Sequence, residues 1–411
     1  MPTYSYTTLK GAINSRLHSK LGLLPDARTS INNSVLRAWS LIDLRSSKRR
    51  ATLAPNLFQD VYQYTCPTDL KGLGIISLQR QTDDRPKTET FDLTTEDEFD
   101  RRKTLNEGLV AFTDRDFTRK LLVSQIIDDK TLIVSTLDST TAGGGTWAVN
   151  GDATNLIADS DNFVKSNGSL KFDLNSGGTT AGLQNSTLNT FDITDYKNQG
   201  SVFVWVYITT TSGVTNFILR LGSSTSNYYS QTVTTTSEGL AFQAGWNLLR
   251  FDLNGATQTG TVTKTACNYV NLYMTKTAGK AADTDYRFDH LMIKRGKFYN
   301  LIYYSKYPWQ TAAGVYIENS TADGDLLNVD TDEYNIILEV CVEDLGLEAR
   351  ESGDSTIAQN RLGTPLGTLP FRPGLISNYQ MKYPSEALLM ITTVHDFASI
   401  DGDDRQFGGQ K

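Results

Sequence analysis

The middle third of the chain carries the strongest constraint on the fold. Between residues 134 and 296, short runs rich in β-branched and aromatic residues recur about every 10–25 residues, with Gly, Asn, Ser and Thr between them. The runs are SLKFDL, SVFVWVYI, NFILRLG, NYYSQTVTT, WNLLRFDL, YVNLYMT and YRFDHLMI. Such runs are short for helices and suit strands. Seven or more strands at this spacing predict an antiparallel β-sandwich.

Charge separates this segment from its flanks. Residues 134–296 hold only 11 basic and 12 acidic residues, residues 1–133 hold 20 and 17, and residues 297–411 hold 8 and 17. A change of texture that later reverses is typical of an inserted domain. We therefore expect a first part of a flanking domain at 1–133, the sandwich at 134–296 with TAGGGTW (141–147) as its linker, and a second part at 297–411.

The flanks carry helical patterns together with a few strands. Apolar residues recur at helical spacing in two N-terminal groups: Leu9, Ile13, Leu17 and Leu21, then Ile31, Val35, Trp39 and Ile42. The clearest helix spans about residues 331–351, where Asp330 and Glu333 form a capping-box pattern. KLLVSQI and KTLIVSTL read as two strands joined by a turn at Asp128-Asp129.

Neither flank contains enough elements to close a core alone. The fold class predicted is an α+β domain, discontinuous in sequence and built from a helical bundle plus a small β-sheet, with an inserted all-β antiparallel sandwich (a jelly roll). The Pro- and Gly-containing tail after Leu362 is expected to form an extended C-terminal arm.

Motifs for catalysis are missing from the sequence. We find no G-x-S-x-G, P-loop, H-E-x-x-H or dinucleotide fingerprint, and the three histidines lie in different segments. The protein is therefore expected not to be an enzyme. No apolar run reaches the length of a membrane span, the N-terminus lacks a signal-peptide core, and the three cysteines are far apart, which favours synthesis in a reducing compartment and no membrane partner.

Aromatic residues alternate along one predicted strand of the sandwich. In SVFVWVYI, Phe203, Trp205 and Tyr207 share one face, and the valines share the other. The aromatic face either belongs to the core or forms a platform on which sugar rings stack. The candidate carbohydrate-binding residues are Trp205, Tyr207, Tyr228, Tyr229 and Trp246.

Carboxylates in the sandwich strands suggest one possible ion. Calcium takes oxygen ligands, and Asp173, Asp252 and Asp289 are the candidate ligands for a calcium site. No other cofactor is expected.

Two segments resemble known families. FDITDYKNQGSVFVWVYI, GWNLLRFDLNGATQTGT and DTDYRFDHLMI, within residues 147–294, resemble carbohydrate-binding-module-like jelly rolls of the family 4/9 type. The flanks resemble the head-to-tail connector (neck or adaptor) proteins of tailed bacteriophages. The residues that carry this second resemblance are the N-terminal helix pair with SSKRRATLAPNLFQDVYQYTCPTDLKG, then YYSKYPW and NVDTDEYNIILEVCVEDLGLEAR.

The second resemblance implies a virion structural protein. It would be a homo-oligomer, commonly a ring of twelve subunits, that is assembled in the host cytoplasm and located in the neck of the virion. Its partners would be the portal protein, the next tail or neck protein, and genomic DNA that passes through the channel without sequence-specific binding. The sandwich would decorate the outside of the ring.

Two other functions remain open. The sandwich could instead bind host glycans in a fibre or adhesin-type virion protein. A glycoside hydrolase with an appended binding module is the third possibility, and it would need paired carboxylates about 5–10 Å apart in a cleft.

Overall fold

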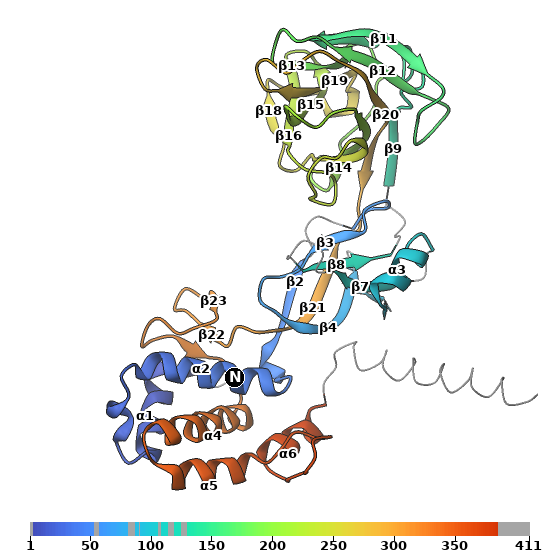
Figure 1. Cartoon of the computed structure of the whole chain (residues 1–411). Helices are drawn as coiled ribbons and strands as arrows, with labels where there is room; N and C mark the ends of the chain where they lie inside the picture. Colours follow the sequence, from blue (N-terminus) through green and yellow to red (C-terminus); the bar gives the residue numbers. More distant parts are fainter. Residues whose placement is uncertain are drawn as a thin grey trace, which may run out of the picture.

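The protein is an elongated molecule of three lobes, built mostly of β-sheets with some helices (Figure 1). The computed structural model describes residues 3–52, 57–80, 87–89, 91–105, 108–113, 119–124 and 130–384. A helical lobe lies at one end, a small β-lobe in the middle, and a β-sandwich at the other end.

The sandwich contains two antiparallel sheets. The first sheet has the order β10-β13-β19-β15-β16-β18, and the second has the order β11-β12-β20-β14-β17, with β9 paired to β20. The strands are β9 (Lys130–Ser135), β10 (Ala148–Gly151), β11 (Ala153–Asp159), β12 (Ser169–Leu174), β13 (Thr180–Asn185), β14 (Gly200–Ile208), β15 (Val214–Ser224), β16 (Asn227–Val233), β17 (Gly245–Asp252), β18 (Thr257–Thr259), β19 (Tyr269–Lys276) and β20 (Asp283–Arg295). A 3₁₀ turn, η3 (Lys264–Ala266), precedes β19.

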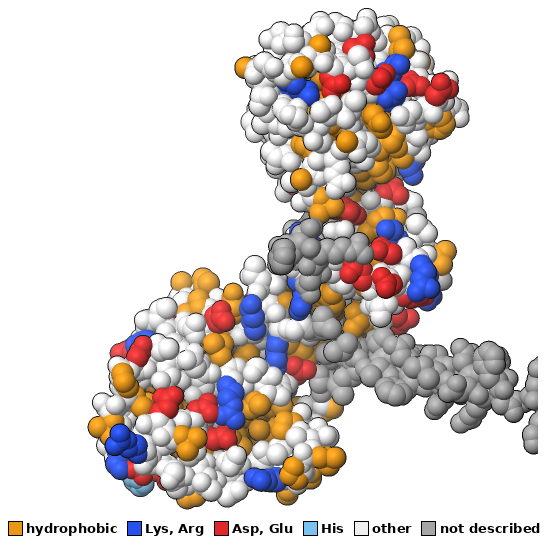
Figure 2. All heavy atoms as spheres, viewed as in Figure 1, with side chains coloured by type: hydrophobic (Ala, Val, Ile, Leu, Met, Phe, Trp, Pro, Cys, Tyr) orange, Lys and Arg blue, Asp and Glu red, His pale blue; other side chains and the backbone are white. Residues whose placement is uncertain are grey.

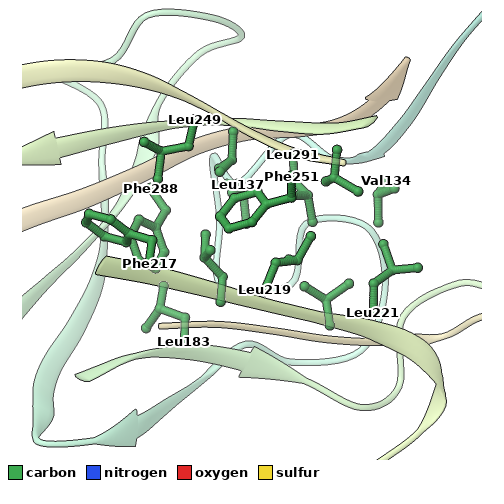
Figure 3. Packing of buried hydrophobic residues seen from close by; sticks show 14 of the residues in the cluster. Val134, Leu137, Leu183, Phe217, Leu219, Leu221, Leu249, Phe251, Phe288 and Leu291 are labelled. Carbon is green, nitrogen blue, oxygen red and sulfur yellow. The ribbon is translucent and has the colours of Figure 1, made fainter. Parts of the chain in front are cut away.

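Side chains from both sheets meet in one hydrophobic core. Figure 3 shows Leu183, Phe217 and Leu219 from one sheet facing Phe251 and Phe288 from the other. All five are at most 2% exposed. The alternation of buried and partly exposed residues along much of β12 and β15 follows the period of two that a half-buried strand requires.

The sandwich begins earlier in the chain than the sequence indicated. β9 pairs with β20, so Lys130 already belongs to the sandwich, and the glycine run at 143–145 lies inside it. The prediction that this run is a linker is wrong. Gly143, Gly144 and Gly145 have φ of 80°, 91° and 62°, and a Cβ there would overlap Val134, Asn189 and Thr187. The three glycines therefore form a packed turn that only glycine fits without strain.

The middle lobe consists of two four-stranded sheets and one short helix. One sheet has the order β2-β21-β4-β5 and the other β3-β8-β7-β6. The elements are β2 (Lys48–Thr52), β3 (Gln63–Thr65), β4 (Leu70–Arg80), β5 (Lys87–Glu89), β6 (Asp92–Leu93), α3 (Glu96–Arg102), β7 (Leu109–Thr113), β8 (Lys120–Val123) and β21 (Tyr299–Ser305). β8 and β9 were expected to be joined by a turn. They belong to different sheets, and the Asp128-Asp129 turn lies outside the described residues.

The helical lobe combines both ends of the chain. Its helices are α1 (Tyr6–Arg16), α2 (Ala27–Leu41), α4 (Thr331–Glu348), α5 (Ser352–Leu362) and α6 (Leu375–Lys382), with 3₁₀ turns η1 (Lys20–Leu23) and η2 (Arg45–Ser47). A small sheet adds β1 (Tyr4–Ser5), β22 (Trp309–Gln310), β23 (Tyr316–Ile317) and β24 (Leu326–Leu327). No helix among the described residues is long and apolar enough to cross a bilayer.

Helix α4 organises this lobe. The predicted capping box is present, since the Asp330 side chain accepts from the Glu333 backbone N–H and the Glu333 side chain accepts from that of Asp330. Glu333 is fully buried, and it also accepts from the Ser46 backbone N–H at 2.9 Å, the Ser46 hydroxyl, and the Tyr379 hydroxyl at 2.6 Å. A buried carboxylate needs such donors because its desolvation is otherwise costly. Glu333 of α4 thereby connects this helix to η2 and α6.

The described parts of the flanking segments form two large hydrophobic cores and a small one around Phe99 of α3, where the sequence pattern suggested one domain. Helices α1, α2, α4, α5 and α6 bury their apolar faces on one another, whereas β2, β3, β4, β7, β8 and β21 bury theirs in the middle lobe. β2 and β4 pair with β21 in one sheet, and β3, β6, β7 and β8 form the other, so the apolar side chains of these strands are buried among the sheets and not on the helices. The tail after Leu362 contains α6, and residues 385–411 of the expected arm lie outside the described residues.

Candidate functional site

The outward face of the sheet that contains β14 and β17 carries a row of aromatic residues. Along β14, Val202, Val204 and Val206 are fully buried in the sandwich core, so the residues between them point to the opposite face. Phe203 is also fully buried there, because the middle lobe covers it. Its ring lies 5.0 Å from that of Phe58, edge to face. Beyond Phe203 the row emerges from under the middle lobe.

Strand pairing brings three of the predicted residues together. Tyr207 lies opposite Trp246 of β17 and Arg287 of β20, and Trp205 is the next outward residue on β14. The rings of Tyr207 and Trp246 are 5.4 Å apart at 70°, and the Arg287 Cζ lies 5.1 Å from the Tyr207 ring centroid. The Trp246 indole N–H donates to the Asn162 Oδ1 at 2.9 Å. These contacts hold the two rings in fixed orientations.

A cavity of about 300 Å³ lies over this row, between the sandwich and the middle lobe. We call it the aromatic cleft. Its lining residues come from the middle lobe, from the loop between β16 and β17, and from β14 and β17: Asp60, Tyr62, Trp205, Thr236, Ser237, Glu238, Leu240, Ala241, Gln243, Ala244, Trp246, Asn247 and Leu248. The Glu238 Oε1 accepts from the Tyr62 backbone N–H at 2.9 Å, which joins two of the walls.

The cleft offers aromatic surface together with hydrogen-bonding groups. Trp205 and Trp246 supply the rings, and Asp60 and Glu238 supply carboxylates. Tyr62 also lines the cleft, and its ring packs on the small cluster of Phe99, Leu109 and Leu122 in the middle lobe. Burial, reinforced by the negative charges of Asp60 and Glu238, raises the pKa of the Tyr62 phenol. That hydroxyl therefore stays protonated at neutral pH and can donate a hydrogen bond.

A buried carboxylate lies beneath the cleft. Asp289 is opposite Trp205 in the sheet and fully buried, and its Oδ2 accepts from the backbone N–H groups of Val164 and Lys165 at 2.7 and 2.8 Å. Burial raises the pKa of Asp289 to about 6 despite these bonds. Its Oδ1 and the Trp205 indole nitrogen have no hydrogen-bond partner in the described part of the chain. One buried polar atom of Trp205 and one of Asp289 therefore lack the hydrogen bond that buried polar atoms usually make.

The remaining candidate sugar-binding residues, Tyr228 and Tyr229, lie on β16 in the other sheet, away from the cleft. Tyr229 is only 3% exposed and belongs to the sandwich core, so its prediction as a surface platform residue is wrong. Adjacent strand residues point to opposite faces, and Tyr229 is the one that points inward. Tyr228 points outward, with the Arg220 Cζ 5.1 Å from its ring centroid.

The three candidate calcium ligands do not form a common site. Asp173 accepts from the Asn155 amide and the Asp285 backbone N–H, Asp252 accepts from the Asn254 backbone N–H, and Asp289 is buried as described. Within the described ranges, no group of three or more His, Cys, Asp or Glu side chains is placed to hold a metal ion.

Several cleft residues could not be identified from the sequence. Asp60 and Tyr62 lie more than a hundred residues before Trp205, and Glu238 lies in a loop with no motif. Only the alternation in β14 and the G-W-N motif of β17 gave a signal.

No protein-family model matches the chain, and no curated protein matches it. Among solved structures, its neighbours are jelly-roll carbohydrate-binding modules. A family 30 module shares 14% identity over 39% of this chain and 98% of its own (TM-score 0.29), and the family 30 module of a cellulosomal cellulase of Clostridium thermocellum shares 14% over 41% and 94% (TM-score 0.26). SGBP-B from a xyloglucan utilization locus in Bacteroides uniformis shares 10% over 60% and 73% (TM-score 0.30). These scores are too low for an argument about function.

Proposed function

We propose that the protein binds carbohydrate non-catalytically, through the aromatic cleft of its sandwich. The observation that carries the proposal is the meeting of Trp205, Trp246 and Tyr62 in one cavity with carboxylate and amide groups. Sugars present C–H faces that pack on aromatic rings and hydroxyls that need hydrogen-bond partners, so they require both kinds of group. Neither an apolar ligand nor a simple ion does.

The size of the cleft limits the ligand. A volume of about 300 Å³ is at the small end of ligand pockets, so it holds one or two sugar units and leaves the rest of an oligosaccharide outside. Trp246 is held by Tyr207 and Asn162 before any ligand arrives. Fixed rings reduce the conformational entropy lost on binding, which favours affinity.

A glycan microarray followed by calorimetric titration of the hits tests this proposal. Trp246→Ala should weaken binding at least about tenfold, since buried tryptophans dominate such interfaces. Tyr228→Ala, on the other sheet, is the matched control and should leave affinity unchanged. The proposal is wrong if no glycan binds, or if both variants behave like the natural protein.

A second function, subunit of a virion head-to-tail connector, is supported by the surface of the helical lobe. Exposed large apolar side chains gather in its C-terminal part: Leu347, Ile357, Leu366, Leu369, Phe371 and Met381. Figure 2 shows apolar side chains on the surface of this lobe. Exposed large apolar side chains are a feature of surfaces that contact other proteins. The phage resemblance supplies the specific form: a ring, commonly of twelve copies, between portal and tail in the virion neck.

The two functions are compatible, since a ring could present the sandwich outward to host glycans. Electron microscopy and mass measurement of the purified chain test the second function. Rings, or binding to a portal ring, are expected, and Leu369→Ser with Phe371→Ser should weaken either. A chain that stays monomeric at high concentration and does not bind a portal would contradict it.

A further inference from the structure

A second cavity adjoins the aromatic cleft on the other side of the β16–β17 loop. It has a volume of about 350 Å³, and we call it the junction pocket. Gln63, Thr65 and Lys120 of the middle lobe form one wall, and Arg250 and Asp252 of β17 form another. The third wall is residues 231–239, which include a run of threonines.

The pocket contains two cations and two carboxylates, but their hydrogen-bonding states differ. Glu238 accepts from the Tyr62 backbone N–H, and Asp252 accepts from that of Asn254 at 3.0 Å. Among the residues that the structure describes, the side chains of Lys120 and Arg250 make no ion pair and no hydrogen bond. The groups that lack partners in this pocket are therefore donors.

Arg250 is half-buried and held in place by the sheet. It lies opposite Phe203, the residue that the middle lobe covers, and burial lowers the pKa of its guanidinium although Asp252 is near. A guanidinium has five N–H donors in a planar fork that fits two oxygens of one anion. Removing it from water without an acceptor is unfavourable, so a ligand oxyanion would be bound strongly there.

The two cavities share part of one wall. Thr236, Ser237 and Glu238 line both the aromatic cleft and the junction pocket. A sugar chain that occupies the cleft is therefore separated from Arg250 and Lys120 only by this loop.

We propose that the junction pocket binds the acid group of an acidic polysaccharide, a uronate carboxylate or a sulfate ester, while a neighbouring sugar unit occupies the aromatic cleft. This inference rests on the proposed carbohydrate binding. Lys120 and Arg250 approach the acid group from two lobes, and the threonine hydroxyls add neutral donors. The selectivity of the protein for acidic over neutral glycans then comes from the lobe junction.

Titration with matched ligands tests this inference. The probes are a galacturonate hexamer, the same hexamer fully methyl-esterified, and a chondroitin hexasaccharide with and without its sulfate. The free acid should bind about tenfold or more tightly than the ester, because charge-assisted hydrogen bonds to the carboxylate are lost on esterification. The chondroitin pair shows whether sulfate serves in place of carboxylate.

Variants separate the pocket from general charge effects. Arg250→Gln should reduce the preference for acid over ester to about twofold or less, and Lys120→Gln, on the opposite wall, should do the same if Arg250→Gln impairs folding. Lys264→Gln removes an equal charge at an exposed position on the sandwich and should change nothing. Equal affinity for acid and ester, or equal effects of Arg250→Gln and Lys264→Gln, would overturn the inference.

The same titrations distinguish this inference from the proposed carbohydrate binding on which it rests. If Trp246→Ala weakens acid and ester alike and Arg250→Gln affects neither, carbohydrate binding holds and the junction pocket is refuted. If Arg250→Gln abolishes binding and Trp246→Ala does not, the junction pocket binds the acid group alone, and the part of the inference that places a neighbouring sugar in the cleft is refuted together with the proposed function of the cleft. If neither hexamer nor either chondroitin binds, the junction pocket is refuted, and carbohydrate binding by the cleft is refuted with it only if the microarray also yields no glycan.

Discussion

The two outward faces of the sandwich carry similar residues and differ in what covers them. On the face of β14 and β17, the middle lobe covers Phe203 and, together with the β16–β17 loop, encloses Trp205 and Trp246 in a cavity. On the opposite face, Arg220 lies 5.1 and 5.3 Å from the ring centroids of Tyr228 and Tyr273. The aromatic residues of this second face therefore contact their own sheet.

Small residues make that second arrangement possible. Tyr273 lies beside Gly182, and Tyr228 beside Gly222, and a Cβ at either glycine would overlap the neighbouring strand. The comparison shows that aromatic content does not by itself produce a binding site. A cleft needs walls from other elements, and here those walls come from a different lobe and a loop.

The largest difference between the faces is expected on removing Phe203. Phe203→Ala should lower the free energy of unfolding by about 3–5 kcal/mol, since it leaves a cavity between two lobes. Tyr228→Ala, on the open face, should cost about 1 kcal/mol. Chemical denaturation of both variants measures the difference, and equal losses would show that the middle lobe does not pack on this face.

The next largest effect on stability is expected at Gly182, a closely packed glycine of the second face. Gly182→Ala should destabilise by about 1–3 kcal/mol, because its Cβ would meet the backbone of Leu272 and Tyr273. Gly177→Ala, whose Cβ would meet only an Asp152 oxygen at 3.7 Å, is the control and should be nearly neutral. Thermal unfolding checks both. A tolerated Gly182→Ala would mean that the strands of this face are further apart than described.

The buried carboxylate under the cleft predicts a pH effect of defined sign. Because the folded protein raises the pKa of Asp289 to about 6, its protonated form is favoured on folding, and this contribution to stability is lost as pH rises from about 4 through 6. Asp289→Asn should remove that dependence, which is at most about 3 kcal/mol. Denaturation at pH 4.5 and 7.5 measures it.

An exposed carboxylate supplies the opposite control. Hydrogen bonds from Thr194 lower the pKa of Asp192, so its contribution is present above pH 4 and is lost as pH falls further. Asp192→Asn should leave unchanged the difference in the free energy of unfolding between pH 4.5 and pH 7.5. If Asp289→Asn also leaves that free-energy difference unchanged, folding does not raise the pKa of Asp289.

The smallest effect concerns the cation of the open face. Arg220→Gln should cost less than about 1 kcal/mol, the usual contribution of an exposed cation–π contact, and should leave glycan affinity unchanged. Differential scanning fluorimetry and the titrations above measure both quantities. A loss of glycan affinity would place the ligand on the second face, which would then be the binding face of the sandwich.

The sequence predicted the sandwich and part of the cleft. Alternation placed Trp205 and Tyr207 on one face of a strand but left open whether that face is buried, and the capping signal at Asp330 placed the start of α4 correctly. The sequence could not show which of Tyr228 and Tyr229 faces inward, because the two adjacent residues are identical. It also could not place Asp60 opposite Trp205, since that depends on how two lobes pack.

Intrinsic tryptophan fluorescence during ligand titration tests the central claim most directly. The chain has five tryptophans, of which Trp39, Trp147 and Trp309 are at most 3% exposed and lie outside the aromatic cleft. A bound glycan should therefore change the emission of Trp205 and Trp246 alone. We expect a saturable change that disappears when both are replaced by phenylalanine, and a change that persists in that double variant would contradict glycan binding in the aromatic cleft.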